Sequence, residues 1–117
     1  MNSGTSTKEF PCLVVPDSNG RPVRHRIVGR EATIGRDETN DIVIPNPLIS
    51  KNHAKIIVSN HSVTVFDLGS VNKTRVNGVE VAQAAVGYGD ELQFARVKCR
   101  LVLASEEELK VEKGLSA

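Results

Sequence analysis

The chain has 117 residues, enough for one domain with short tails and too few for two domains. Its residues are 39% hydrophobic and 25% charged, which is typical of a globular protein and excludes general disorder. The 15 Lys and Arg residues nearly balance the 14 Asp and Glu residues, so the net charge of +1 indicates neither a nucleic acid nor a membrane as partner.

The N-terminal segment, the lack of long apolar runs and the cysteine count indicate where the protein is expected to reside. Residues 1–9 are rich in Ser, Thr and Asn and lack the apolar core of a signal peptide, so we expect a flexible arm there. No apolar run approaches the length of a membrane span. The two cysteines are too few for a disulfide scaffold and lack the spacing of a metal site. We therefore expect a soluble, intracellular domain.

Short apolar stretches separated by Gly, Pro, Asn and Asp run from Phe10 to Ala104 and predict strands. The predicted strands are 13–15, 23–28, 31–34, 41–44, 53–58, 63–68, 74–76, 79–81, 91–94 and 97–103. This spacing predicts an antiparallel β-sandwich or barrel, with an aliphatic core because aromatic residues are few.

The end of the domain shows the clearest strand periodicity. In 97–103, one face is predicted to be apolar and the other basic: Val97, Cys99, Leu101 and Leu103 against Lys98 and Arg100. Cys12 lies in another apolar stretch, so both cysteines are expected to be buried thiols rather than a metal or redox pair. Residues 105–117 begin with Ser105 and three glutamates, which indicates a short helix or a linker.

Three predicted loops hold most of the polar side chains that could bind a ligand or take part in a reaction. They are 35–36, 50–53 and 69–74, the last followed closely by Asn77-Gly78. Loops of a sandwich gather at its two ends, so these three are expected to meet at one end. They offer a guanidinium, ammonium groups, hydroxyls and an amide, and no carboxylate lies in the second or third. Such a donor-rich set suits an anion, and a phosphate dianion in particular.

The order and spacing of these residues resemble those of the forkhead-associated (FHA) domain. The matching elements are Gly35-Arg36, Ser50-x-x-His53, Asn72-x-Thr74 and Asn77-Gly78. The resemblance covers residues 10–104, between the arm and the C-terminal tail. It implies a β-sandwich of about eleven strands that binds phosphothreonine peptides and has no catalytic activity or cofactor.

The resemblance also implies roles for individual residues. Arg36 would pair with the phosphate, Ser50 would donate its hydroxyl to it, and Lys51 would add a further phosphate contact. Asn72 would bind the peptide backbone beside the phosphothreonine. Thr74 would contact the phosphate or shape the loop.

Other matching positions are expected to support the site. Gly35 and His53 would be architectural, and Asn77 and Gly78 would support the third loop. At Lys73 the family usually has Gly, so a backbone with positive φ is expected there at some cost in strain.

The sequence gives less support to three other functions. An enzyme would need a nucleophile–base pair or a metal cluster, and the three histidines form neither. Assembly or homodimerisation through the sandwich, with vestigial phosphate binding, is the main alternative. A nucleic-acid role would rest only on the arginines at 21–30, which we expect to be a solvated strand face. The segment Ser50–Ala54 is similar to FHA domains of nuclear DNA-damage-response proteins, which predicts a nuclear location.

Overall fold

The computed structural model describes residues 8–60 and 62–105, and within these ranges it contains strands and no helix. The strands are β1 (Glu9–Pro16), β2 (Pro22–Arg26), β3 (Glu31–Gly35), β4 (Ile42–Val43), β5 (Ala54–Val58), β6 (Val63–Asp67), β7 (Thr74–Val76), β8 (Val79–Val81), β9 (Gln83–Val86), β10 (Glu91–Phe94) and β11 (Val97–Ser105). The prediction of an all-β fold with about eleven strands is confirmed. Most of the predicted arm and of the C-terminal helix or linker lies outside the described residues.

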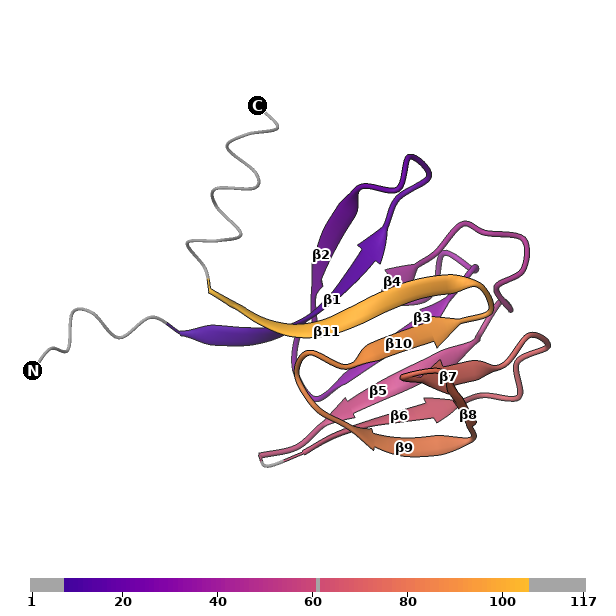
Figure 1. The fold of residues 1–117 in the computed structure, drawn as a ribbon. Coiled ribbons are helices and arrows are strands. Elements are labelled where there is room, and N and C mark those ends of the chain that lie inside the picture. The colour runs from indigo at the N-terminus through magenta and orange to yellow at the C-terminus, as the bar shows by residue number, and fades with distance from the viewer. Residues whose placement is uncertain (1–7, 61, 106–117) are drawn as a thin grey trace, which may run out of the picture.

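The strands form two sheets packed as a sandwich (Figure 1). The six-stranded sheet has the order β2-β1-β11-β10-β7-β8, and the five-stranded sheet has the order β4-β3-β5-β6-β9. Consecutive strands often lie in different sheets, so the chain crosses repeatedly between the layers. Within the five-stranded sheet, the end of β3, the start of β5 and the end of β6 lie side by side, so the loops that join β3 to β4, β4 to β5 and β6 to β7 gather near one end.

One strand pair departs from the predicted antiparallel arrangement, because β4 runs parallel to β3. The loop between them turns back on itself, and Asp41 fixes the turn. Its carboxylate accepts a hydrogen bond from the Thr33 backbone N–H at 2.9 Å, and its own N–H donates to the Thr33 hydroxyl at 3.0 Å. Side-chain bonds thus stabilise a parallel pair in which β4 has only two residues.

Strand β9 was not predicted from the sequence. Its four residues, Gln83–Val86, include two alanines, which have low intrinsic preference for strands. The strand forms because its backbone pairs with β6, with Val86 opposite Val63. Tertiary pairing therefore determines this element more than its local sequence does.

The core between the sheets is aliphatic, as predicted. Its largest fully buried side chains include Leu13, Ile34, Ile56, Leu92 and Leu101, together with one aromatic ring, Phe94. The other aromatic side chains that the structure describes lie nearer the surface. An example is Phe10, whose ring centroid lies 3.4 Å from the guanidinium carbon of Arg26.

The predicted apolar face of β11 is correct as far as Leu101 and wrong at Leu103, which is 40% exposed. β10 pairs with β11 only as far as Arg100, whereas β1 continues alongside β11 to Ser105. The β1–β11 pair runs past the end of β10 (Figure 1), and there the buried side of β11 shifts by one residue, so Ala104 is fully buried and Leu103 is exposed. The prediction that both cysteines are buried thiols is confirmed, because each is buried and neither forms a disulfide. Burial, with a smaller effect of the Glu91 charge, raises the pKa of the Cys99 thiol to about 12.

Candidate functional site

Three loops lie together at one end of the sandwich and are joined by hydrogen bonds. The first loop is 36–41, the second is 44–53 and the third is 68–73. The Arg36 backbone N–H donates to the Ser50 carbonyl at 3.0 Å and joins the first loop to the second. The Val71 N–H donates to the Ser50 hydroxyl at 3.0 Å, and the Asn72 amide donates to the Leu48 carbonyl at 2.8 Å. The structure thus brings together the loops that the sequence singled out.

Gly35 allows the first loop to approach the second closely. A Cβ atom at this position would lie 2.1 Å from the Lys51 carbonyl oxygen and 2.6 Å from the Asn40 side-chain nitrogen. Asn40 bridges the same region, because its amide donates to the Lys51 carbonyl at 2.7 Å and to the Asp37 carbonyl at 2.9 Å. Sequence analysis missed Asn40, since one asparagine in a polar loop is no distinctive signal until its burial is seen.

His53 connects the second loop to the third from beneath the site. Its side chain is fully buried and lies edge-on to Phe94, with ring centroids 5.8 Å apart. Nδ1 accepts a hydrogen bond from the Ser50 N–H at 3.1 Å, so in the neutral ring Nε2 carries the proton and donates to the Lys73 carbonyl at 3.0 Å. The imidazole has no free nitrogen and is placed to hold the loops together, which is the architectural role that the sequence predicted.

Asp67 braces the third loop. Its carboxylate accepts hydrogen bonds from the Ser70 hydroxyl, from the Ser70 and Gly69 N–H groups at 2.9 and 3.0 Å, and from the Thr74 hydroxyl at 2.7 Å. Burial favours the protonated form of Asp67, but these hydrogen bonds outweigh it and hold the pKa of Asp67 below its usual value. Asp67 is therefore ionised at neutral pH and fixes the start and the end of the loop.

Thr74 lies behind the site and not on its surface. Its side chain is fully buried, and its hydroxyl donates to Asp67. A phosphate cannot reach it in this arrangement, so of the two roles predicted for Thr74 the structure supports loop shape and not phosphate contact.

Asn77 and Gly78 form the turn between β7 and β8, with φ values of 49° and 87°. The Asn77 N–H donates to the Glu91 carbonyl at 2.9 Å, and the Glu91 N–H donates to the Asn77 side-chain oxygen at 3.0 Å. These bonds fix β7 to β10. The pair thus supports the strand that follows the third loop.

Arg36 and Ser50 present hydrogen-bond donors at the surface. Arg36 is exposed, and its Nε donates to the Ile49 carbonyl at 3.0 Å, which fixes the guanidinium and leaves its terminal nitrogens for a ligand. Ser50 is half-buried and its oxygen already accepts the Val71 N–H, so its own proton can be donated outward.

Asn72 and two lysines complete the donor set. The exposed Asn72 uses one amide N–H internally, which leaves its other N–H and its oxygen able to bind a ligand. Lys51 and Lys73 are also exposed, and Lys73 has the positive φ that was expected, at 73°. The neighbouring acid is Asp37, whose pKa is lowered first by the Thr39 hydroxyl and N–H, and then by nearby positive charge. Asp37 therefore partly offsets the positive potential of the loops.

A groove of about 400 Å³ begins beside Asn72. Its lining residues are Leu48, Asn72, Arg75, Gln93, Ala95 and Arg96. Arg75 lies 3.9 Å from Glu80, so part of its charge is compensated. Sequence analysis missed Gln93, Ala95 and Arg96, because they follow the third loop by some twenty residues and reach the site only through the pairing of β10 with β7.

Residues 8–60 and 62–105 hold no group of three or more His, Cys, Asp or Glu side chains placed to bind a metal ion. The same residues include no helix of the length and apolarity needed to cross a membrane.

Comparison with known proteins identifies the family. The sequence profile of the FHA domain matches residues 32–95. The chain is 34% identical over 64 residues to the glycogen accumulation regulator GarA of Mycobacterium tuberculosis, which covers 55% of this chain and 40% of that protein. It is 30% identical over 86 residues to the oxoglutarate dehydrogenase inhibitor of Corynebacterium efficiens, which covers 74% of this chain and 61% of that protein.

A solved structure agrees with these sequence matches. The FHA domain of the CT664 protein from Chlamydia trachomatis superposes with a TM-score of 0.73 at 29% identity, over 81% of this chain and 97% of that one. The matched region spans less than two thirds of the curated relatives described above. Because the profile covers more than half of the chain and the sandwich superposes on a solved FHA domain, the chain belongs to the FHA family.

Proposed function

We propose that the chain binds phosphothreonine-containing segments of partner proteins at the surface formed by Arg36, Ser50 and Asn72, and so recruits phosphorylated partners. One observation carries this proposal: each of the three side chains makes one bond to a neighbouring loop and keeps further capacity for a ligand. The donors are thus fixed before the ligand arrives, which reduces the entropy lost on binding.

Each residue has a distinct role in this proposal. The guanidinium of Arg36 pairs with the phosphate dianion through charge-assisted hydrogen bonds, and Ser50 donates a neutral one. Asn72 binds the peptide backbone next to the phosphothreonine and sets its register. Lys51 and Lys73 attract the anionic segment over a longer range, so their effect weakens as salt concentration rises.

The proposal includes a preference for phosphothreonine over phosphoserine. The FHA resemblance implies an apolar niche for the threonine methyl group. One buried methyl group contributes about 1 kcal/mol, which corresponds to a preference of roughly fivefold. Titration calorimetry with matched phosphothreonine, phosphoserine and unphosphorylated peptides measures it, and equal affinity for the two phosphopeptides would remove this part of the proposal.

The decisive experiment compares two arginines at opposite ends of β3. Arg36→Ala removes a charge-assisted hydrogen bond and is expected to weaken phosphopeptide binding about 10- to 150-fold. Arg30→Ala is the matched control, because Arg30 is also exposed and precedes the strand that Arg36 follows. It should change affinity less than about twofold. Unchanged affinity of Arg36→Ala for a phosphothreonine peptide selected from an oriented library would refute the phosphate assignment.

Two relatives suggest a regulatory setting for this binding. One relative is a regulator of glycogen accumulation and another is an inhibitor of oxoglutarate dehydrogenase, so we propose a regulatory module that acts by binding phosphorylated protein segments in signalling. Both relatives are bacterial and lend no support to a nuclear DNA-damage role. The intracellular, nuclear location stays a prediction from the sequence, which localisation of the tagged full-length protein would test.

A further inference from the structure

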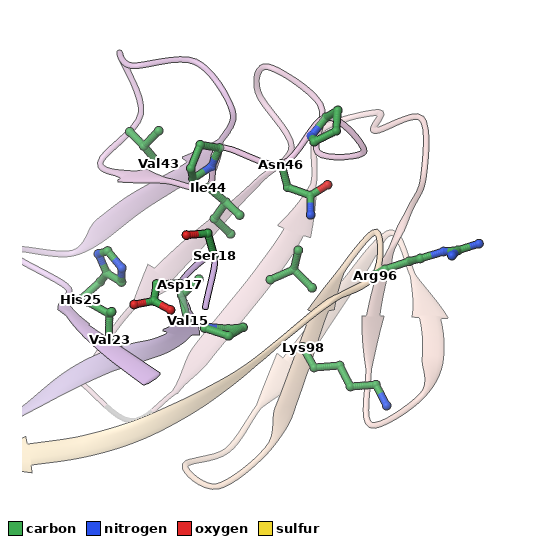
Figure 2. A pocket seen from close by; sticks show the side chains of 14 residues that line it. Val15, Asp17, Ser18, Val23, His25, Val43, Ile44, Asn46, Arg96 and Lys98 are labelled. Atoms are coloured by element: carbon green, nitrogen blue, oxygen red, sulfur yellow. The ribbon is translucent and has the colours of Figure 1, made fainter. Parts of the chain in front are cut away.

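A larger groove lies between β2 and the segment that follows β4, where the second loop begins. Its volume is about 820 Å³, and its apolar lining includes Val15, Val23, Val43, Ile44 and Val97. Figure 2 shows the labelled side chains of this groove arranged around one space. The groove is thus large and apolar enough to hold several side chains of an extended segment.

The groove is open because the two sheets end at different places. In β2, Val23 pairs with Val15 of β1 and turns the same face toward the sandwich interior. On the opposite sheet the edge strand is β4, which has only two residues and cannot cover β2. Val23 is therefore 37% exposed, whereas Val15 is only 4% exposed. An apolar strand face is left without a partner layer.

The rim of the groove is positively charged. Arg96 and Lys98 line it, and Figure 2 shows their charged ends pointing away from Val15 and Val23. Asp17 is the one acidic residue in the lining, and its carboxylate accepts hydrogen bonds from two backbone N–H groups of its own turn, each at 2.9 Å. Burial lowers the pKa of His25, so this imidazole is neutral at pH 7. The groove therefore favours apolar side chains flanked by acidic ones.

This groove is continuous with the groove beside Asn72. Arg96 lines both of them, and the neighbouring residues Pro47 and Leu48 line one each. A peptide that leaves Asn72 along the smaller groove therefore reaches the larger one by passing Arg96.

We propose that the groove between β2 and β4 binds a second segment of the same phosphorylated partner, C-terminal to the phosphothreonine, with aliphatic side chains flanked by Asp or Glu. This rests on the proposed function, which places the phosphothreonine at Arg36, and it adds that the following residues run along the smaller groove beside Asn72. The larger groove then adds affinity and selects among partners that carry the same phosphorylated core sequence.

The test uses a phosphothreonine peptide library that is fixed through the fourth position after the phosphothreonine and randomised beyond it. About eight randomised residues span roughly 27 Å when extended, enough to cross Arg96 and enter the groove. We expect selection of aliphatic residues with neighbouring Asp or Glu in the randomised part. The selected peptide should bind about tenfold more tightly than its version truncated after the fourth position, since each buried aliphatic side chain adds to affinity.

Two edge-strand variants make the test specific. Val23→Asp places a charge in the groove and is expected to reduce the affinity of the long peptide to that of the truncated one. Val79→Asp is the control, because Val79 is a 65% exposed valine on the opposite edge strand of the same sheet, and it should change neither affinity. Unchanged binding of the truncated peptide shows that Val23→Asp is folded.

The outcomes separate the two proposals. If the truncated peptide binds and the long one binds no better, or if Val23→Asp keeps the tenfold difference, the groove proposal is wrong and the phosphate site stands. If neither peptide binds, the proposed function fails, and this inference fails with it. Sedimentation that shows a dimer dissociated by Val23→Asp, with equal binding of both peptides, would assign the groove to a second copy of the chain and overturn the proposal.

Discussion

Lys73 occupies a backbone conformation that glycine adopts more easily, and Lys73→Gly separates two effects of this residue. With φ at 73°, a non-glycine residue carries about 1–2 kcal/mol of strain. The bonds that the Lys73 carbonyl accepts from the His53 ring and the Ala95 N–H hold the loop in place. Glycine relieves the strain but loses about 0.5–1 kcal/mol through greater freedom of the unfolded chain. The expected net gain in unfolding free energy is about 0.5–1 kcal/mol.

The assay combines thermal melts with phosphopeptide titrations on the parent and two variants. A gain of this size should raise the melting temperature of Lys73→Gly by about 2–6 °C. Lys73→Ala is the matched control, since it removes the ammonium group while keeping the Cβ atom and the strain. It should melt within about 3 °C of the parent. Both variants should lose less than about tenfold in affinity and show a weaker dependence on salt, because both lack the same exposed charge.

Two results would refute this reasoning. If Lys73→Gly melted no higher than Lys73→Ala, the strain at positive φ would not exceed the entropic loss caused by glycine, and the expected net gain would be absent. If Lys73→Gly melted below the parent, the loop would have a different conformation, and the positions of Asn72 and Thr74 would need revision.

Three further predictions concern the loops and the smaller groove. Gly35→Ala should lower the unfolding free energy by at least about 2 kcal/mol in denaturant titrations, because its Cβ would overlap the backbone of the second loop. The control Gly87→Ala should change it by less than about 0.5 kcal/mol, because a Cβ there would lie 3.7 Å from its nearest neighbour, an Asp90 carboxylate oxygen. Asp67→Asn should be destabilised by about 1–2 kcal/mol at pH 7. Because the folded pKa of Asp67 is lowered, this difference should shrink as pH falls below the ordinary value of 3.8, and a constant difference down to pH 2 would contradict the assignment. At the third position after the phosphothreonine, a peptide library should select aliphatic or acidic residues, since Arg75 and Arg96 line that groove, whereas selection of Lys or Arg would contradict it.

The sequence singled out most of the residues that the structure brings together at the loop end of the sandwich, because they belong to local motifs. Gly35-Arg36, Ser50-x-x-His53 and Asn72 each occupy a short stretch at a strand end, and strand periodicity places those ends in a sandwich. The architectural role of His53 followed from the family resemblance, and the structure supplies its physical form, a ring with both nitrogens bonded inside the protein. The positive φ of Lys73 was foreseen for the same reason, since the family usually has Gly there.

Features that depend on tertiary neighbours could not be predicted. The exposure of Leu103 reflects how far β10 accompanies β11, and β9 forms because β6 is beside it. Burial alone moves Thr74 from ligand contact to loop support and brings Asn40 into the site. Arg96 reaches the smaller groove beside Asn72 through the pairing of β10 with β7. It is too far along the chain from Asn72 for a local motif to include both.

The edges of the two sheets also affect how the domain behaves at high concentration. Three of the four outer strands are short or protected: β4 has two residues and is followed by two prolines within four positions, β8 has three residues and carries Glu80, and β2 begins with Pro22 and includes two arginines. Short, charged or proline-bearing edges discourage backbone pairing between molecules. Copies of the domain crowded on a scaffold should therefore resist strand exchange and aggregation. A sheet continued from one molecule to the next would have to form at β9, whose four residues carry no charge and no proline.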